Sequence, residues 1–285
     1  MKGRFRKDLS VLTLSTLIFL LLMVSSHATA AVQSTPNLNS IIQQSIEKVD
    51  SNRLRETVAY VENYGNRSTW EKQRDAARWA GEHLRKSGLK VRLETYEHEG
   101  QTWPNVVAEI RGTTKTREIV LVSAHIDSIS DTPHREAPGA DDDGTGVAAV
   151  LEIARILRQV PLERTVLFCL FTNEERGTHG SKHFARYARE HALDIRAVIN
   201  LDVLGYNAPK RLAPLEAIRS HHTFKHKIKS IYRMSYNYLR STFSRRDRVK
   251  IGGRNEDAAL VNIVAQRFEQ YANLGVKQIT GSGCV

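Results

Sequence analysis

Cysteine is scarce in this chain, with only two among 285 residues. Cys169 lies inside an apolar run and Cys284 lies beside the terminus, so neither has an obvious partner and we predict no disulfide. Internal repeats and low-complexity blocks are also absent from the sequence. No apolar run reaches the roughly 20 residues that a helix needs to span a bilayer. These absences exclude a disulfide framework and a repeat architecture.

Residues 1–30 have the pattern of a secretory signal peptide. Four basic residues precede the apolar stretch Val11–Val24, and Ala28-Thr29-Ala30 then offers the small-x-small pattern that signal peptidase cleaves. We therefore predict a signal over residues 1–30, cleavage after Ala30 and a secreted or periplasmic protein. Contact with a membrane is expected only if the signal stays uncleaved.

The composition is that of a globular protein with an excess of positive charge. Hydrophobic residues make up 41% of the chain and charged residues 26%, which predicts a sizeable core. Much of the net charge of +11 lies between Lys225 and Lys250, where aromatic residues alternate with basic ones. Such a segment can bind single-stranded nucleic acid or lipid headgroups, but it is also typical of a solvated amphipathic helix. We favour the helix and predict no nucleic-acid partner, because exported proteins rarely meet nucleic acid.

The first part of the mature chain reads as helices followed by a pair of strands. Residues 38–64 have helical apolar spacing with a break near Asp50, where Ser51 or Asn52 is expected to cap a second helix. Residues 70–86 predict a further helix. Two strands, over residues 91–96 and 106–110, are expected to be joined by Glu99-Gly100-Gln101.

From Glu118 onward, apolar strand-like runs alternate with helical patterns. Alternating strands and helices predict an α/β fold, a three-layer αβα sandwich with a mixed, mainly parallel central sheet. No domain boundary is evident after the signal, so residues 31–285 are expected to form a single domain. The helices of this part are predicted over residues 144–160, 181–192, 223–239 and 257–271, and its last strand over residues 276–280.

Acidic and imidazole side chains follow the ends of successive apolar runs. His125 and Asp127 follow residues 119–122, and three adjacent aspartates occupy a glycine-rich turn. In an open α/β sheet, ligands bind at the carboxyl ends of the strands, so these clusters are expected to converge. The clusters are His125 with Asp127, then Asp141, Asp142 and Asp143, then Glu174 with Glu175, and finally Asp202.

These residue types suit a zinc site. Zinc binds imidazole nitrogen and carboxylate oxygen, which makes His125 a natural ligand, and Asp127 could fix the orientation of its ring. A cation would relieve the repulsion among the three aspartates, although one of them could instead cap the helix that starts near Gly144. Of two adjacent glutamates, one can bind metal while the other accepts a proton. Two exposed glutamates in a turn are the plainer alternative.

At this point the sequence resembles the secreted co-catalytic zinc aminopeptidases, a family with the phosphorylase/hydrolase-like fold. The order and spacing of the motifs carry the resemblance, which covers about residues 102–207. The matching motifs are Ser-Ala-His-Ile-Asp-Ser at 123–128, Ala-Pro-Gly-Ala-Asp-Asp-Asp-Gly-Thr-Gly at 137–146, Asn-Glu-Glu-Arg-Gly at 173–177 and Asn-Leu-Asp at 200–202.

The resemblance implies two Zn2+ ions and a role for each residue. His125 and Asp202 would bind one metal, Asp142 would bridge both, and Glu175 would bind the other. Glu174 would be the general base and Asp127 would orient His125, while the Asp142–Asp143 peptide is a candidate for a cis bond. The implied reaction is the removal of N-terminal residues from peptides or small proteins by a water molecule that the metals activate. Residue preference and oligomeric state stay open.

The chain departs from the family at one expected ligand. Family members carry a further histidine in a C-terminal segment, whereas this chain has none after His226, which leaves the metal at Glu175 short of a ligand. His179 and His183 are expected at the start of a helix, facing solvent. Two alternatives therefore stand beside the peptidase. One is a truncated, catalytically impaired, non-enzymatic relative, and the other is a glutaminyl-cyclase-like enzyme, a class that usually holds a single zinc.

Overall fold

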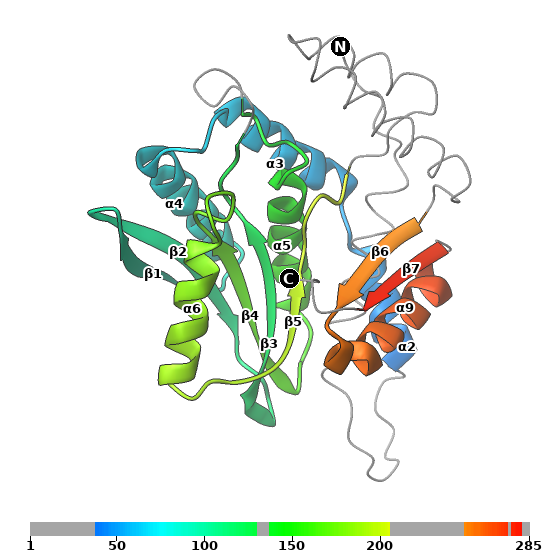
Figure 1. Cartoon of the computed structure of the whole chain (residues 1–285). Coiled ribbons are helices and arrows are strands. Elements are labelled where there is room, and N and C mark those ends of the chain that lie inside the picture. The colour runs from blue at the N-terminus through cyan, green and yellow to red at the C-terminus, as the bar shows by residue number, and fades with distance from the viewer. Residues whose placement is uncertain (1–37, 130–136, 206–247, 273–274, 281–285) are drawn as a thin grey trace, which may run out of the picture. The chain divides into compact units, whose positions relative to one another are not determined.

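A computed structural model describes residues 38–129, 137–205, 248–272 and 275–280 (Figure 1). These residues belong to two compact units, one within residues 1–205 and one within residues 206–285. The predicted signal over residues 1–30 and the predicted helix over residues 223–239 lie outside the described residues. A single domain over residues 31–285 stays a prediction. Within the described ranges, no helix combines the length and apolarity needed to cross a membrane.

The first unit is built around a five-stranded mixed sheet with the order β1-β2-β4-β3-β5. β2 runs antiparallel to β1 and β4, whereas β3 runs parallel to β4 and β5. Four of the five strands therefore point the same way, as the mainly parallel prediction requires. The strands are β1 Lys90–His98, β2 Gln101–Ile110, β3 Lys115–His125, β4 Arg164–Phe171 and β5 Asp194–Asn200.

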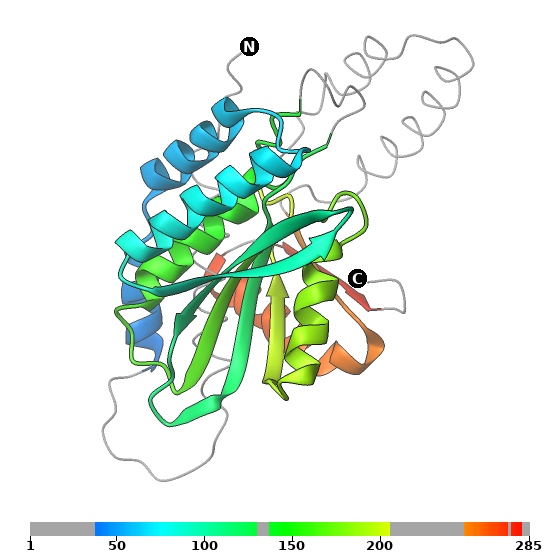
Figure 2. The same ribbon diagram turned by 90° about the vertical axis from the view of Figure 1, so that its left-hand side faces the viewer.

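Helices cover both faces of this sheet, which confirms the three-layer αβα sandwich. Figure 2 shows α3, α4 and α5 together on one face and α6 on the other. α5 is buried at nearly every position, because it lies between the sheet and the outer helices α3 and α4. The helices of this unit are α2 Leu38–Glu47, α3 Ser51–Tyr64, α4 Trp70–Lys86, α5 Gly144–Leu157 and α6 His179–Glu190.

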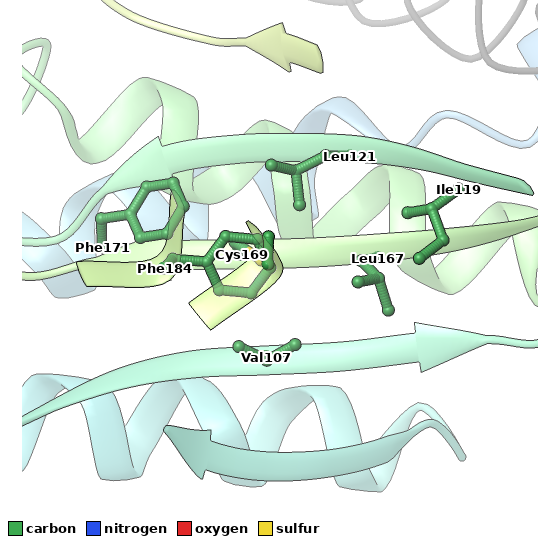
Figure 3. Packing of buried hydrophobic residues seen from close by; sticks show 8 residues of the cluster. Val107, Ile119, Leu121, Leu167, Cys169, Phe171 and Phe184 are labelled. Carbon is green, nitrogen blue, oxygen red and sulfur yellow. The ribbon is translucent and has the colours of Figure 1, made fainter. Parts of the chain in front are cut away.

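The central strands supply the core. Every residue of β4 is buried, the continuous apolar pattern typical of a strand covered on both faces. On the α6 side, Leu121 and Leu167 pack with Phe171 and Phe184 around Cys169 (Figure 3). Burial raises the pKa of the Cys169 thiol, so this free cysteine behaves as a small apolar residue.

The helix caps refine the sequence predictions. The carboxylate of Asp50 accepts hydrogen bonds from the backbone N–H groups of Asn52 and Arg53, so Asp50 caps α3 and the predicted Ser51 or Asn52 cap is wrong. α5 ends at Leu157 rather than residue 160, and α6 begins two residues before the predicted residue 181. The helix over residues 70–86 and the hairpin of β1 and β2 are confirmed.

The second unit contains two parallel strands joined through a helix. β6 Arg248–Gly253 pairs with β7 Gly275–Thr280, and between them lie the 3-10 helix η1 Asn255–Asp257 and α9 Ala258–Ala272. The predicted helix and last strand are confirmed. β6 was not predicted, because the alternation of basic and apolar residues over residues 248–251 is only four residues long and two glycines follow it.

Candidate metal centre

Three side chains from separate segments meet at the carboxyl end of the sheet. His125 is the last residue of β3, Asp142 lies in the turn before α5, and Asp202 follows β5. One ligand atom from each lies within 4.8 Å of the others, and His125 Nε2 is 3.0 Å from Asp142 Oδ1. The strand-end argument therefore placed these residues correctly. Their role as metal ligands stays a prediction.

The aspartate turn divides its carboxylates between the metal site and the backbone. Asp143 is fully buried, and its carboxylate accepts hydrogen bonds from His125 N at 3.1 Å and Gly146 N at 2.9 Å. It therefore caps α5 and holds the end of β3 at once, so the capping alternative holds for this aspartate. The Asp142–Asp143 peptide is cis, as the resemblance implied, and Asp142 faces the site with its side chain half-exposed.

Asp141 positions the segment that carries Asp202. Its Oδ1 accepts a hydrogen bond from Gly205 N at 2.8 Å, while Thr145 Oγ1 accepts one from Leu204 N at 3.0 Å. Residues 201–205 are therefore fastened to the aspartate turn and to the start of α5. These hydrogen bonds fix the position of Asp202 relative to Asp142.

The two glutamates lie on the segment 172–177 between β4 and α6, which we call the Glu174 loop. Asp127 is buried, and its two carboxylate oxygens accept hydrogen bonds from Glu174 N at 3.0 Å and Glu175 N at 3.1 Å. Its Oδ1 also lies 3.5 Å from His125 Nδ1, an ion-pair distance beyond that of a strong hydrogen bond. Asp127 thus holds the Glu174 loop through two hydrogen bonds, a contact that the sequence did not reveal, and its orienting role toward His125 stays a prediction.

Both glutamate side chains border the three clustered residues. Glu174 Oε2 lies 4.0 Å from His125 Nε2, and the side chain is partly exposed. Burial and the nearby Asp142 raise the pKa of Glu175 to about 7. Glu174 is therefore within reach of a water molecule at the site, and Glu175 shares an electrostatic environment with Asp142.

The electrostatics of the site call for a cation. Burial lowers the pKa of His125, but Asp127, Asp143 and Glu174 outweigh that effect and raise it to about 10. Burial raises the pKa of Asp202, and Asp142 raises it further. Repulsion between neighbouring carboxylates favours their protonated forms. A bound cation would remove that repulsion and favour the deprotonated forms, which are the forms that bind metal. The nitrogen and oxygen donor set fits zinc.

Arg67 is a buried contributor that the sequence analysis missed. Its side chain is 2% exposed and donates hydrogen bonds to five backbone carbonyls. These belong to the end of α3, the residue after His125 and the turn before the aspartates. Burial lowers the pKa of Arg67 to about 10, while Asp127 and Asp143 act against that shift. The acceptors are Val61 O, Gly65 O, Ile126 O, Pro138 O and Gly139 O.

The expectation that His179 and His183 face solvent is wrong. His183 Nε2 lies 2.9 Å from Glu94 Oε1, and its ring stacks on Tyr96 at 5.2 Å. The His179 ring stacks on His98 at 3.8 Å. Both histidines lie at the start of α6 as predicted, but their rings contact side chains of β1 there instead of facing solvent.

The comparisons with known proteins follow the same segments. The sequence profile described as peptidase family M28 matches residues 105–259, which is more than half of the chain. This protein belongs to peptidase family M28. The matched range contains every predicted ligand and the glutamate pair.

Similar curated proteins carry peptidase names. A "Probable zinc metalloprotease" of Pyricularia oryzae is 30% identical over 193 residues, which cover 60% of this chain and 38% of that protein. A "Leucine aminopeptidase 1" of Ajellomyces capsulatus is 35% identical over 154 residues, with 48% and 38% covered. The chain thus spans about two fifths of the length of these relatives.

Solved structures agree on the fold. The LapA aminopeptidase of Legionella pneumophila aligns with a TM-score of 0.63 and 19% identity, covering 90% of this chain and 62% of that one. LapB from the same organism gives a TM-score of 0.63 with 21% identity, covering 90% and 62%. At these identities the likeness establishes the architecture.

Proposed function

We propose that this family M28 member is an exported zinc exopeptidase that removes N-terminal residues from peptides. The observation that carries the proposal is the meeting of His125, Asp142 and Asp202 within 4.8 Å, with Glu174 beside them. A zinc site with a free carboxylate next to it is the minimum that metal-assisted peptide hydrolysis needs. The aminopeptidase name of similar proteins supports the exopeptidase assignment.

His125, Asp142 and Asp202 would hold one zinc ion, and Asp142 with Glu175 would face a second. Zinc bound there would polarise the scissile carbonyl and make a water molecule a better nucleophile at neutral pH. Asp143 accepts a hydrogen bond from His125 N and Asp127 accepts one from Glu174 N, so both carboxylates support the backbone around the site rather than bind metal.

Glu174 is the residue that we assign to proton transfer. Its backbone is fastened by Asp127, while its partly exposed carboxylate stays 4.0 Å from His125 Nε2. A general base must be near the water without being tied to the metal, and this placement meets both conditions. Glu174 would take a proton from the attacking water and deliver it to the leaving amine.

The test is a comparison of Glu174→Gln with a control, Glu190→Gln, which changes an exposed glutamate at the end of α6. Zinc content is measured by elemental analysis, and turnover is measured with leucyl-nitroanilide and other aminoacyl-nitroanilides. We expect Glu174→Gln to lower kcat by about 10²–10⁴-fold with zinc content unchanged, because general acid–base catalysis contributes that factor. The control should keep the activity.

Two results would contradict the proposal. A Glu174→Gln protein that turns over within twofold of the parent would remove Glu174 from the reaction. A zinc-loaded parent protein that hydrolyses none of the aminoacyl substrates would instead match a non-enzymatic relative.

A further inference from the structure

The Glu174 loop begins with two residues that are almost completely buried. Thr172 is 0% exposed and Asn173 is 1% exposed. Asn173 also has a left-handed backbone, with φ of 54°, a conformation that asparagine adopts more readily than most residues with a side chain. The residue that follows directly is the proposed base.

The hydroxyl of Tyr96 contacts both residues. It lies 3.2 Å from Thr172 O and 3.0 Å from Thr172 Oγ1, and it accepts a hydrogen bond from Asn173 Nδ2 at 3.2 Å. Tyr96 is 6% exposed, and its ring stacks on His183. One buried oxygen atom on β1 thus joins the two residues that precede Glu174.

Two amide side chains also form hydrogen bonds with the start of the Glu174 loop. Asn105 Oδ1, on β2, accepts a hydrogen bond from Thr172 N at 3.2 Å, and its Nδ2 donates to Gly180 O at 3.0 Å and to Glu94 Oε2 at 2.9 Å. Gln73 Oε1, on α4, accepts one from Asn173 N at 2.9 Å. Both Asn105 and Gln73 are 0% exposed.

These side chains reach the loop from both sides of the sheet. α4 covers the face opposite to α6, while Asn105 also binds the first turn of α6 through Gly180 (Figure 2). Within the part of the chain that the structure describes, the hydrogen bonds of these three side chains go to the Glu174 loop, to Gly180 and to Glu94, and not to a predicted metal ligand. Their effect on the site therefore passes through the loop backbone. Buried and mutually satisfied polar groups of this kind fix one arrangement, because any other would leave them unpaired.

We infer that Tyr96, Asn105 and Gln73 are positioning residues that set the place of the Glu174 carboxylate. The inference rests on the proposed function for its meaning in catalysis, because it takes Glu174 as the base. The hold on the loop itself is independent of that assignment. The Tyr96 hydroxyl is the best group to remove in a test, because Tyr96→Phe leaves the ring and its packing in place.

The test compares Tyr96→Phe with Tyr64→Phe in the full chain. The Tyr64 hydroxyl also donates to a backbone carbonyl, Lys72 O at 3.2 Å, but at an exposed position between α3 and α4. We expect Tyr96→Phe to lower kcat by about 10–100-fold, because a catalytic group misplaced by about 1 Å can cost about 10²-fold in rate. KM should stay within about twofold, and so should the affinity for the zinc ion assigned to His125, Asp142 and Asp202, because none of these three residues lies on the Glu174 loop. Gln73→Met should shift kcat in the same direction.

Hydrogen exchange supplies a readout that needs no turnover. In metal-free protein, amides of residues 172–175 should exchange about tenfold faster in Tyr96→Phe, as expected for losing about 1.4 kcal/mol of local protection, while β3 amides stay unchanged. The Tyr64→Phe control should alter neither readout. Unchanged exchange together with unchanged kcat in Tyr96→Phe would overturn the inference. Faster exchange in Tyr96→Phe, together with a parent protein that hydrolyses no substrate, would support the hold on the loop while refuting the proposed function.

Discussion

Replacing Arg67 by methionine should destabilise the first unit more than any exposed substitution. The guanidinium donates to five backbone carbonyls at 2.7 to 3.1 Å, and it ties the end of α3 to the strand end after His125 and to the turn before Asp141. Methionine keeps the aliphatic packing but donates no hydrogen bond. Five carbonyl acceptors, two of them in fully buried hydrogen bonds, would then be left without this donor.

The magnitude follows from two opposing effects. A hydrogen bond to a charged group contributes about 1.5–3 kcal/mol. Against this, the pKa of Arg67 falls from 12.5 to about 10 because burial outweighs the attraction of Asp127 and Asp143, and this net shift corresponds to about 3 kcal/mol against the charged form. Three of the five contacts come from Nη1, which has two N–H groups, so the guanidinium makes at most four full hydrogen bonds. Four bonds at the low end of the range outweigh that cost by about 3 kcal/mol. We therefore expect Arg67→Met to lose about 2–4 kcal/mol of unfolding free energy.

Urea unfolding followed by tryptophan fluorescence measures this loss. All three tryptophans, Trp70, Trp79 and Trp103, lie in the first unit, so their fluorescence reports its unfolding. The control is Arg78→Met, which removes an exposed arginine that pairs with Asp75 at 3.4 Å on the surface of α4. That change should cost less than about 1 kcal/mol, because exposed ion pairs contribute little.

A loss below about 1 kcal/mol for Arg67→Met would refute the reasoning. It would mean that water or a relaxed backbone satisfies the five carbonyls without the guanidinium. A loss of unfolding free energy equal to that of Arg78→Met would refute the reasoning in the same way.

Two further predictions concern the space at two glycines and export. Gly180→Ala should lose more than about 2 kcal/mol of unfolding free energy, because a Cβ there would overlap Asn105 Oδ1 and lie 2.5 Å from Thr172 O. Gly81→Ala, in the interior of α4, should gain about 0.5–1 kcal/mol of unfolding free energy, because a Cβ there would lie 3.6 Å or more from its neighbours. Thermal unfolding of the two variants checks this pair, and equal melting temperatures would contradict it. Exported protein should have the intact mass of a chain that starts at residue 31, whereas the mass of the full chain would argue against cleavage.

Much of the fold was open to prediction because its strongest signals are local. β4 reads as a strand from its uninterrupted apolar run, and α4 reads as a helix from its spacing and its serine-glycine stop. The order of strands and helices then restricts the architecture to a few layered arrangements. β6 escaped prediction because it is short and contains glycine, so its pairing with β7 depends on a contact between distant segments.

The candidate site divides in the same way. Strand-end position predicted that the acidic clusters would meet at one edge of the sheet, and the family resemblance singled out Asp142 among its two neighbouring aspartates. No sequence pattern singles out the residues that support the site. Arg67 lies in a loop that shows no periodicity, and Gln73 reads as an ordinary polar residue of a helix.

The sequence by itself determined the layered architecture, the family resemblance and the identity of the residues that form the candidate centre, because strand, helix and motif signals are each contained in a few adjacent residues. Only the tertiary structure decided which side chains hold that centre. Gln73 meets Asn173 across 100 positions, and Arg67 meets Gly139 across 72. Such contacts arise when helices pack on the sheet, and no local pattern encodes which buried polar group will meet which backbone atom.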